Sequence, residues 1–135
     1  MTNQLYGLGR EAFLNGDLDW ASNDIKVVLV DTNDYTVSIN THQFLSDVPS
    51  GARVATSANL SSKTATLGVA DAADVTFSAV TGDQSEALVI YQDSGSAATS
   101  RLIAYIDTAT GLPVTPNGAD ITVTWDNGSN RIFAL

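Results

Sequence analysis

The stretch ALVIYQDSGSAATSRLIAYI, residues 87–106, decides the fold of this protein. Its two apolar runs, Ala87–Tyr91 and Leu102–Ile106, are rich in residues that favour β-strands, and Asp93–Ser96 between them is typical of a turn. Apolar side chains at consecutive positions predict strands that are buried on both faces of a sheet. We therefore expect a β-hairpin in the middle of an antiparallel sheet.

The strongest strand pattern before this hairpin is Ile25–Asp31, which is apolar at every position between Lys26 and Asp31. A run of this kind predicts a central strand rather than an edge strand. The residues that follow, 32–51, mix an extended pattern with a helical spacing that Pro49 ends. We expect a long connection that contains one short helix.

The remaining strands are predicted from alternating segments and from segments rich in Thr, Ser and Val. Three half-buried strands are expected at Ala52–Leu60, Lys63–Val69 and Val75–Val80. Near the end, Ile121, Val123 and Trp125 alternate with threonines, which predicts a strand with these three side chains on its buried face. Asp126–Gly128 favours a turn and Arg131–Leu135 is again apolar, so we expect a closing hairpin.

Residues 4–15 predict a short amphipathic helix, because Leu5, Leu8 and Ala12 recur at helical spacing and Asn15–Gly16 supplies a stop. The chain then carries roughly seven or eight short strands, about one every ten residues. This pattern predicts an all-β, mainly antiparallel fold: a β-sandwich or barrel-like domain with a short N-terminal helix. Residues 1–135 are expected to form this single domain.

The composition argues against several classes of partner. The chain carries 15 acidic and 6 basic residues, a net charge of −9, and the basic residues are scattered singly. Phosphate binding needs clustered cations, so we expect no nucleic-acid partner. The apolar runs are far shorter than the roughly 20 residues of a membrane span, and the N-terminus has no secretory-signal pattern. We expect a soluble protein that does not associate with membranes and is used without export.

The sequence contains no pattern typical of a catalytic or cofactor site. There is no cysteine, the one histidine is His42, and no Gly-x-Ser-x-Gly motif is present. Thiolate chemistry is therefore excluded, and a hydrolase triad would depend on coincidence. His42 is expected to be an ordinary surface or turn residue. We expect a protein that is not an enzyme, and we assign no catalytic, cofactor-binding or metal-binding residue.

The loop aspartates leave one alternative open. Hard cations such as Ca²⁺ bind several carboxylate oxygens, and these aspartates could meet in space, although none has an EF-hand spacing. Their other role is to cap helices and turns. The aspartates in question are Asp17, Asp19, Asp31, Asp34, Asp71, Asp74 and Asp126.

The aromatic residues are spread along the chain, and most are expected in the core. Trp20 and Tyr35 flank the first predicted strand among polar residues. Two interpretations therefore stay open for this pair, as core residues or as interface anchors.

Two stretches resemble small virion proteins of tailed phages and prophages. The first is GREAFLNGDLDW, residues 9–20, which runs into DIKVVLVD, residues 24–31. The second is ITVTWDNGSNRIF, residues 121–133. Together with GARV at 51–54 and DVTFSAV at 74–80, the resemblance extends through most of the chain.

The resemblance implies a structural component of the phage particle with no enzymatic residues. Within that class we favour a capsid decoration, or cement, protein that docks on the outer capsid surface and stabilises the head, since small acidic β-rich domains suit an outer coat. The implied partners are the major capsid protein and further copies of the chain, most often as a homotrimer. The implied location is the virion, after synthesis in the host cytoplasm. The expected contacts are Thr2–Arg10 and Thr32–Pro49, because segments that core packing explains poorly often carry binding.

Two other functions remain as alternatives. A tail or fibre-associated structural or receptor-binding protein would bind host glycan, but the chain has none of the repeats of a fibre shaft. A hydrolase of cell wall or glycan would need a carboxylate constellation, which the sequence alone does not reveal.

Overall fold

The predicted hairpin lies in the middle of the largest sheet. In the computed structural model of the chain, which describes residues 4–109, 111–125 and 131–135, β6 (Ala87–Gln92) pairs antiparallel with β7 (Leu102–Ile106). β2 (Ile25–Val30) pairs with β6 along its whole length, from Ile25 opposite Gln92 to Val30 opposite Ala87. Nearly every residue of these three strands is buried, so both the hairpin and the central strand are confirmed.

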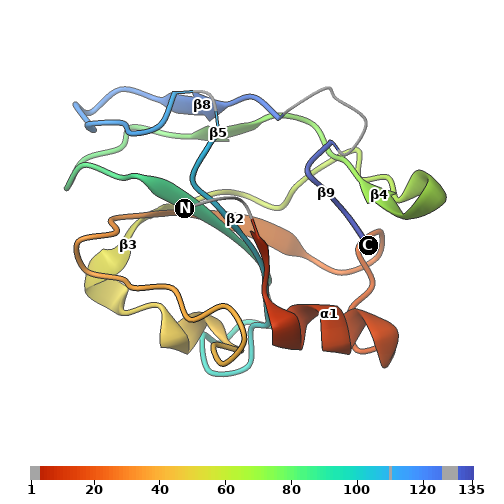
Figure 1. The fold of residues 1–135 in the computed structure, drawn as a ribbon. Helices are drawn as coiled ribbons and strands as arrows, with labels where there is room; N and C mark the ends of the chain where they lie inside the picture. The colour runs from red at the N-terminus through yellow and green to blue at the C-terminus, as the bar shows by residue number, and fades with distance from the viewer. Residues whose placement is uncertain (1–3, 110, 126–130) are drawn as a thin grey trace.

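Two short strands complete this sheet. β1 (Gln4–Leu5) pairs with β7, and β3 (Arg53–Thr56) pairs with β2, which gives the order β1-β7-β6-β2-β3. All four pairings are antiparallel. The sheet is open, with β1 and β3 as its two edges (Figure 1).

Two small antiparallel sheets cover one face of the large one (Figure 1). β5 (Val75–Phe77) pairs with β8 (Ile121–Val123), and β4 (Val69–Ala70) pairs with β9 (Phe133–Ala134). A large apolar core fills the space between the layers. It joins Val27, Leu29 and Ile90 of the large sheet to Phe77 and Trp125 of the covering layer.

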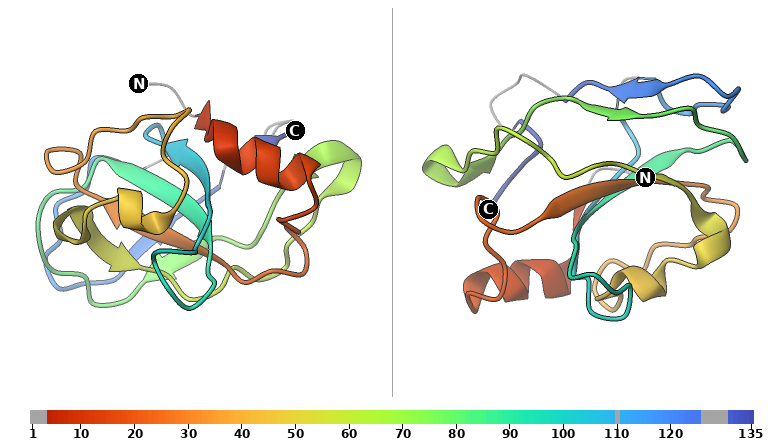
Figure 2. Two further views of the ribbon diagram at one scale, coloured as in Figure 1. Left: turned by 90° about the horizontal axis from the view of Figure 1, so that it is seen from below. Right: turned by 180° about the vertical axis from the view of Figure 1, so that it is seen from behind.

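The opposite face is covered by residues 31–52, which include the 3-10 turns η1 (Leu45–Asp47) and η2 (Ser50–Ala52) (Figure 2). The helix α1 (Gly7–Leu14) packs against β7, and its buried Ala12 belongs to the first core. A second core lies on the face covered by residues 31–52, and it contains Val28 and Val89 of the sheet together with Tyr35 and Val48 of the connection. The predicted connection therefore contains two short helical turns rather than one. Contrary to expectation, core packing explains part of Thr32–Pro49.

The N-terminal helix is shorter than predicted. Residues 4–15 were expected to be helical, but Gln4–Leu5 form β1 and the helix spans Gly7–Leu14. The Tyr6 N–H donates to the Ile103 carbonyl at 2.9 Å, so pairing with β7 holds the chain extended up to the first helical turn. The stop at Asn15–Gly16 is confirmed, because Asn15 is the C-cap and Gly16 has a φ of 79°.

The predicted closing hairpin is wrong. β8 pairs with β5 and β9 pairs with β4, so the two strands have different partners. The turn Asp126–Gly128 lies outside the described residues. The alternation is confirmed, because Val123 and Trp125 are buried while Thr122 and Thr124 are exposed.

The three strands predicted between residues 52 and 80 are shorter than expected. Ala52–Leu60 contains only β3, and Val75–Val80 contains only β5. In Lys63–Val69, an isolated bridge at Thr64 is followed by the 3-10 turn η3 (Thr66–Gly68), and only Val69 enters β4. Exposed Thr and Ala residues there provide no apolar face to bury.

The described chain is thus mainly antiparallel sheet with one short α-helix. None of the helices in its described part has the length and apolar character that a membrane crossing requires.

Candidate functional site

The two segments predicted to make contacts lie side by side. The Gly7 N–H donates to the Ile39 carbonyl at 2.8 Å, and the hydroxyl oxygens of Tyr6 and Tyr35 lie 2.8 Å apart. Thr2 and Asn3 fall outside the described residues. From Gln4 onward, the first segment forms the sheet edge and the start of α1, and the second packs directly against it.

Hydrogen bonds among three polar side chains, those of Tyr6, Tyr35 and His42, hold the two segments together. The Tyr35 hydroxyl lies 2.8 Å from His42 Nδ1 and also 2.8 Å from the Tyr6 hydroxyl. The Ser38 N–H, which can only donate, also points at Nδ1 from 3.3 Å, so Nδ1 is the acceptor nitrogen. Tyr35 therefore donates to His42, and Tyr6 donates to Tyr35.

The two tyrosines are poor candidates for reactive groups. Burial raises the pKa of Tyr6 far above its ordinary value, with a further contribution from Tyr35. Burial likewise raises the pKa of Tyr35 to about 12. Both hydroxyls stay protonated near neutral pH, so they act as hydrogen-bond donors that position the N-terminal segment. The structure places His42 at the end of a turn, where the backbone N–H of His42 donates to the Ser38 carbonyl at 3.0 Å.

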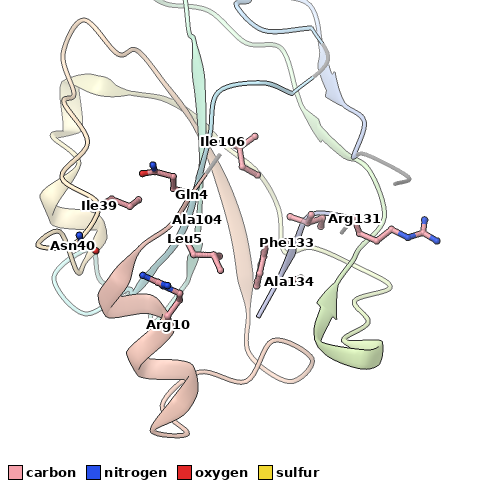
Figure 3. Close-up of a pocket in the computed structure, with 11 residues that line it drawn as sticks. Gln4, Leu5, Arg10, Ile39, Asn40, Ala104, Ile106, Arg131, Phe133 and Ala134 are labelled. Atoms are coloured by element: carbon pink, nitrogen blue, oxygen red, sulfur yellow. The ribbon is translucent and has the colours of Figure 1, made fainter. Parts of the chain in front are cut away.

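A groove of about 670 Å³ runs along the edge of the large sheet at β1 (Figure 3). Gln4 and Leu5 of β1 lie between two walls, one formed by the connection and the other by the C-terminal strand. The lining residues come from five parts of the chain: Gln4, Leu5, Arg10, Ile39, Asn40, Ala104, Ile106, Arg131, Ile132, Phe133 and Ala134. The sequence predicted the N-terminal and connection residues of this set but not those of β7 or β9.

The groove carries positive charge on an acidic protein. Two of the six basic residues of the chain, Arg10 and Arg131, line it, although the net charge is −9. The guanidinium of Arg131 lies 3.9 Å from the Asp71 carboxylate. The exposed Arg10 has no ion pair among the described residues. Its charge is therefore available to a negatively charged partner.

Most of the aspartates considered as cation ligands have other roles. Asp19 accepts from the Ala21 and Ser22 N–H groups at 3.1 and 3.2 Å, and hydrogen bonding from Ser22 lowers its pKa. Asp74 accepts from the Trp125 N–H at 3.0 Å. Asp17 lies 4.0 Å from Arg101, Asp71 pairs with Arg131 as described above, and Asp126 is outside the described residues.

The structure brings Asp31 and Asp34 together with Asp83, which the sequence did not single out. One carboxylate oxygen of each lies within 4.8 Å of the others. Asp31 is buried and accepts from the Asn33 N–H at 2.9 Å, while Asp34 and Asp83 are exposed. With one oxygen from each, the three carboxylates supply half or fewer of the six to eight oxygens that Ca²⁺ takes, so backbone, water or second carboxylate oxygens would have to provide the rest.

Trp20 and Tyr35 are core residues, so the interpretation as interface anchors is wrong. Their side chains are buried, and both hydrogen-bond within the fold. The Trp20 indole N–H donates to the Asp71 carbonyl at 3.3 Å, and its ring packs edge-on against Phe133. A polar sequence neighbourhood did not reveal this, because the groups that bury both residues are distant in sequence.

Three large apolar side chains are exposed at one end of the molecule. Leu14, Leu67 and Leu135 are 87%, 97% and 62% exposed, and we call them the leucine end. Phe13, Gly68 and Leu135 line one hollow of about 350 Å³, which brings the three leucines to the same region. Exposed apolar side chains gathered in one place are typical of protein contact surfaces.

Comparison with models of known protein families found no match, and comparison with curated protein sequences found none. The functional argument therefore rests on the fold and on the groove at β1.

Proposed function

We propose that this protein is a non-enzymatic capsid decoration protein that docks on the outer surface of a phage head and stabilises it. The observation that carries the proposal is the groove at β1, where an edge strand of the sheet lies beside Arg10, which has no ion pair with any residue that the structure describes. Open strand edges are ready sites for association with another chain. The resemblance of the sequence to phage virion proteins supplies the partner, the major capsid protein.

Self-association is the second part of the proposal. Such coat proteins are commonly trimeric, and the leucine end offers each copy an apolar surface beside the groove, since Phe133 lines both the groove and the hollow at the leucine end. We expect sedimentation equilibrium to give a homo-oligomer, most simply a trimer. A Leu67→Asp variant, altered at a fully exposed position, should shift the equilibrium toward monomer. Monomer alone for the unmodified protein at micromolar concentration would count against self-association in solution.

The fold class proposed with this function is a β-sandwich. Its support is the layering, in which β5 and β8 lie across an apolar core from the five-stranded sheet (Figure 1). A sandwich of this kind presents its edges and loops to partners while both core faces stay covered.

Copy number tests the proposal against its main alternative. Quantitative mass spectrometry of purified particles should give a copy number comparable to that of the major capsid protein, in the hundreds per particle. A few copies per particle would contradict decoration and favour the tail or fibre-associated alternative.

A further inference from the structure

In β1, Leu5 is the described residue whose backbone faces away from β7, since the next outward-facing N–H, that of Gly7, already donates to the Ile39 carbonyl. Gln4 lies opposite Tyr105 and Leu5 opposite Ala104, and the Tyr6 N–H donates to the Ile103 carbonyl. Antiparallel ladders alternate between residues bonded to the partner strand and residues that face away. Because Tyr6 is bonded to β7, Leu5 directs its N–H and C=O away from β7, into the groove.

The groove also has the shape that an added strand requires. Ile39 and Asn40 flank β1 on one side, and Phe133 and Ala134 flank it on the other (Figure 3). A strand lying beside β1 would direct alternate side chains toward these two walls. Phe133 and Ala134 make one wall apolar, whereas the other presents Ile39 beside the exposed, polar Asn40, so the geometry favours a segment that directs apolar side chains toward Phe133.

The charges of the protein indicate which side chains the added segment would carry. The chain has a net charge of −9, and a further acidic partner would be repelled from most of its surface. At the groove, Arg10 offers a guanidinium that no described carboxylate neutralises. An acidic side chain on the incoming segment would gain a charge-assisted hydrogen bond there.

We propose that an extended, acidic segment of the major capsid protein adds to the large sheet as a strand beside β1. Its backbone bonds to the N–H and C=O of Leu5, its apolar side chains contact the Phe133 wall, and an acidic side chain binds Arg10. This inference rests on the proposed function, because it names the contact through which decoration occurs.

Charge reversal tests the role of Arg10. We expect Arg10→Glu to weaken binding to capsids depleted of this protein by at least about tenfold, with a smaller salt dependence than the unmodified protein shows. The control is Arg53→Glu on β3, which makes the same charge change at the opposite edge of the sheet and also removes the hydrogen bond from Arg53 Nε to the Val48 carbonyl. Thermal unfolding of each variant verifies that it is folded. Equal weakening by both reversals would assign the effect to net charge and overturn the assignment of the groove.

Site-specific crosslinking tests the strand itself. The photoreactive residue p-benzoylphenylalanine replaces Gln4 in one variant and the exposed Thr56 of β3 in the other. On depleted capsids, the Gln4 variant should crosslink to one acidic segment of the capsid protein, and the Thr56 variant should not. On binding, hydrogen exchange at the Leu5 amide should slow.

The outcomes separate the two proposals. Capsid binding by the unmodified protein, together with normal binding by Arg10→Glu and no Gln4 crosslink, overturns the groove but leaves decoration standing. Crosslinks from Gln4 to a second copy of the chain overturn the capsid segment as occupant. No binding of the unmodified protein to depleted capsids overturns both proposals.

Discussion

Gly9 of α1 lies so close to β7 that a Cβ atom on it would fall 2.5 Å from the Leu102 carbonyl oxygen. The same Cβ would lie 3.3 Å from the Ile103 Cα, so the helix packs directly against strand backbone. This contact sets the position of the helix that carries Arg10, and through it one part of the groove.

Gly9→Ala should destabilise the fold by about 1–3 kcal/mol, because the added methyl meets backbone atoms that cannot turn aside. Urea unfolding of the purified variant measures the effect. Gly51→Ala is the matched control, because its Cβ would meet nothing within 4 Å. The control should leave the free energy of unfolding unchanged or slightly raised, and an equal loss in both variants would contradict the close approach.

Tyr35→Phe should cost about 1–3 kcal/mol near neutral pH, because it leaves the buried Tyr6 hydroxyl without its acceptor and removes the Tyr35 donor from His42. The measurement is again urea unfolding. Tyr105→Phe serves as a control, since that tyrosine is buried in the same core but has no hydroxyl hydrogen bond described. A smaller loss of unfolding free energy for Tyr35→Phe than for Tyr105→Phe would contradict the hydrogen bonds that join Tyr6, Tyr35 and His42.

The protein should lose stability steeply above about pH 10. All four tyrosines have pKa values raised above the ordinary value of 10.0, mainly by burial. Between the unfolded and folded pKa values, the unfolded chain loses protons that the folded chain keeps, so each tyrosine lowers the free energy of unfolding by about 1.4 kcal/mol per pH unit. The stabilisation is complete below pH 10.0 and lost as the pH rises through the folded pKa, which for Tyr35 is about 12.

Unfolding in urea at a series of pH values from 8 to 12 measures this slope. Tyr35→Phe should make the alkaline slope shallower, since one proton-retaining group is removed. A stability that is flat through this range would show that the tyrosine hydroxyls are accessible to solvent.

The β6–β7 hairpin could be predicted from the sequence because nearly all of its residues are buried. Short runs of consecutive apolar residues are typical of strands that are covered on both faces. The pairing of the two C-terminal strands, β8 and β9, could not be predicted in this way. Val123 and Trp125 revealed their buried face by alternation, but alternation carries no information about which strand lies opposite. β8 pairs with β5 and β9 pairs with β4, and the two strands of each pair are far apart in the sequence.

The groove could be predicted only in part for the same reason. Its N-terminal and connection residues belong to segments that stood out as poor core formers, whereas Phe133 resembled any other apolar strand residue. Arg10 was one of six singly placed cations, and only the ion pairs of residues 4–109, 111–125 and 131–135 set it apart, because none of them includes Arg10. Sequence patterns report local burial, while a groove depends on residues that folding brings together.

Trp125→Ala should destabilise the fold by about 3–5 kcal/mol, since the side chain is buried and its indole N–H donates to the Ala73 carbonyl at 3.0 Å. Thr124→Ala, at the exposed position beside it, should change stability by less than about 0.5 kcal/mol. Equal effects of the two substitutions in urea unfolding would mean that the alternation of β8 and its flank has been misassigned.

The temperature at which phage particles release DNA tests the central proposal most directly. A cement protein that bridges neighbouring subunits adds contacts that must break before the shell opens, and its binding free energy adds to particle stability by mass action. Particles without the protein should assemble but release DNA at a lower temperature, and adding back the purified protein should restore the release temperature. Release at the same temperature from depleted and complete particles, with no binding of the purified protein to depleted capsids, would contradict decoration.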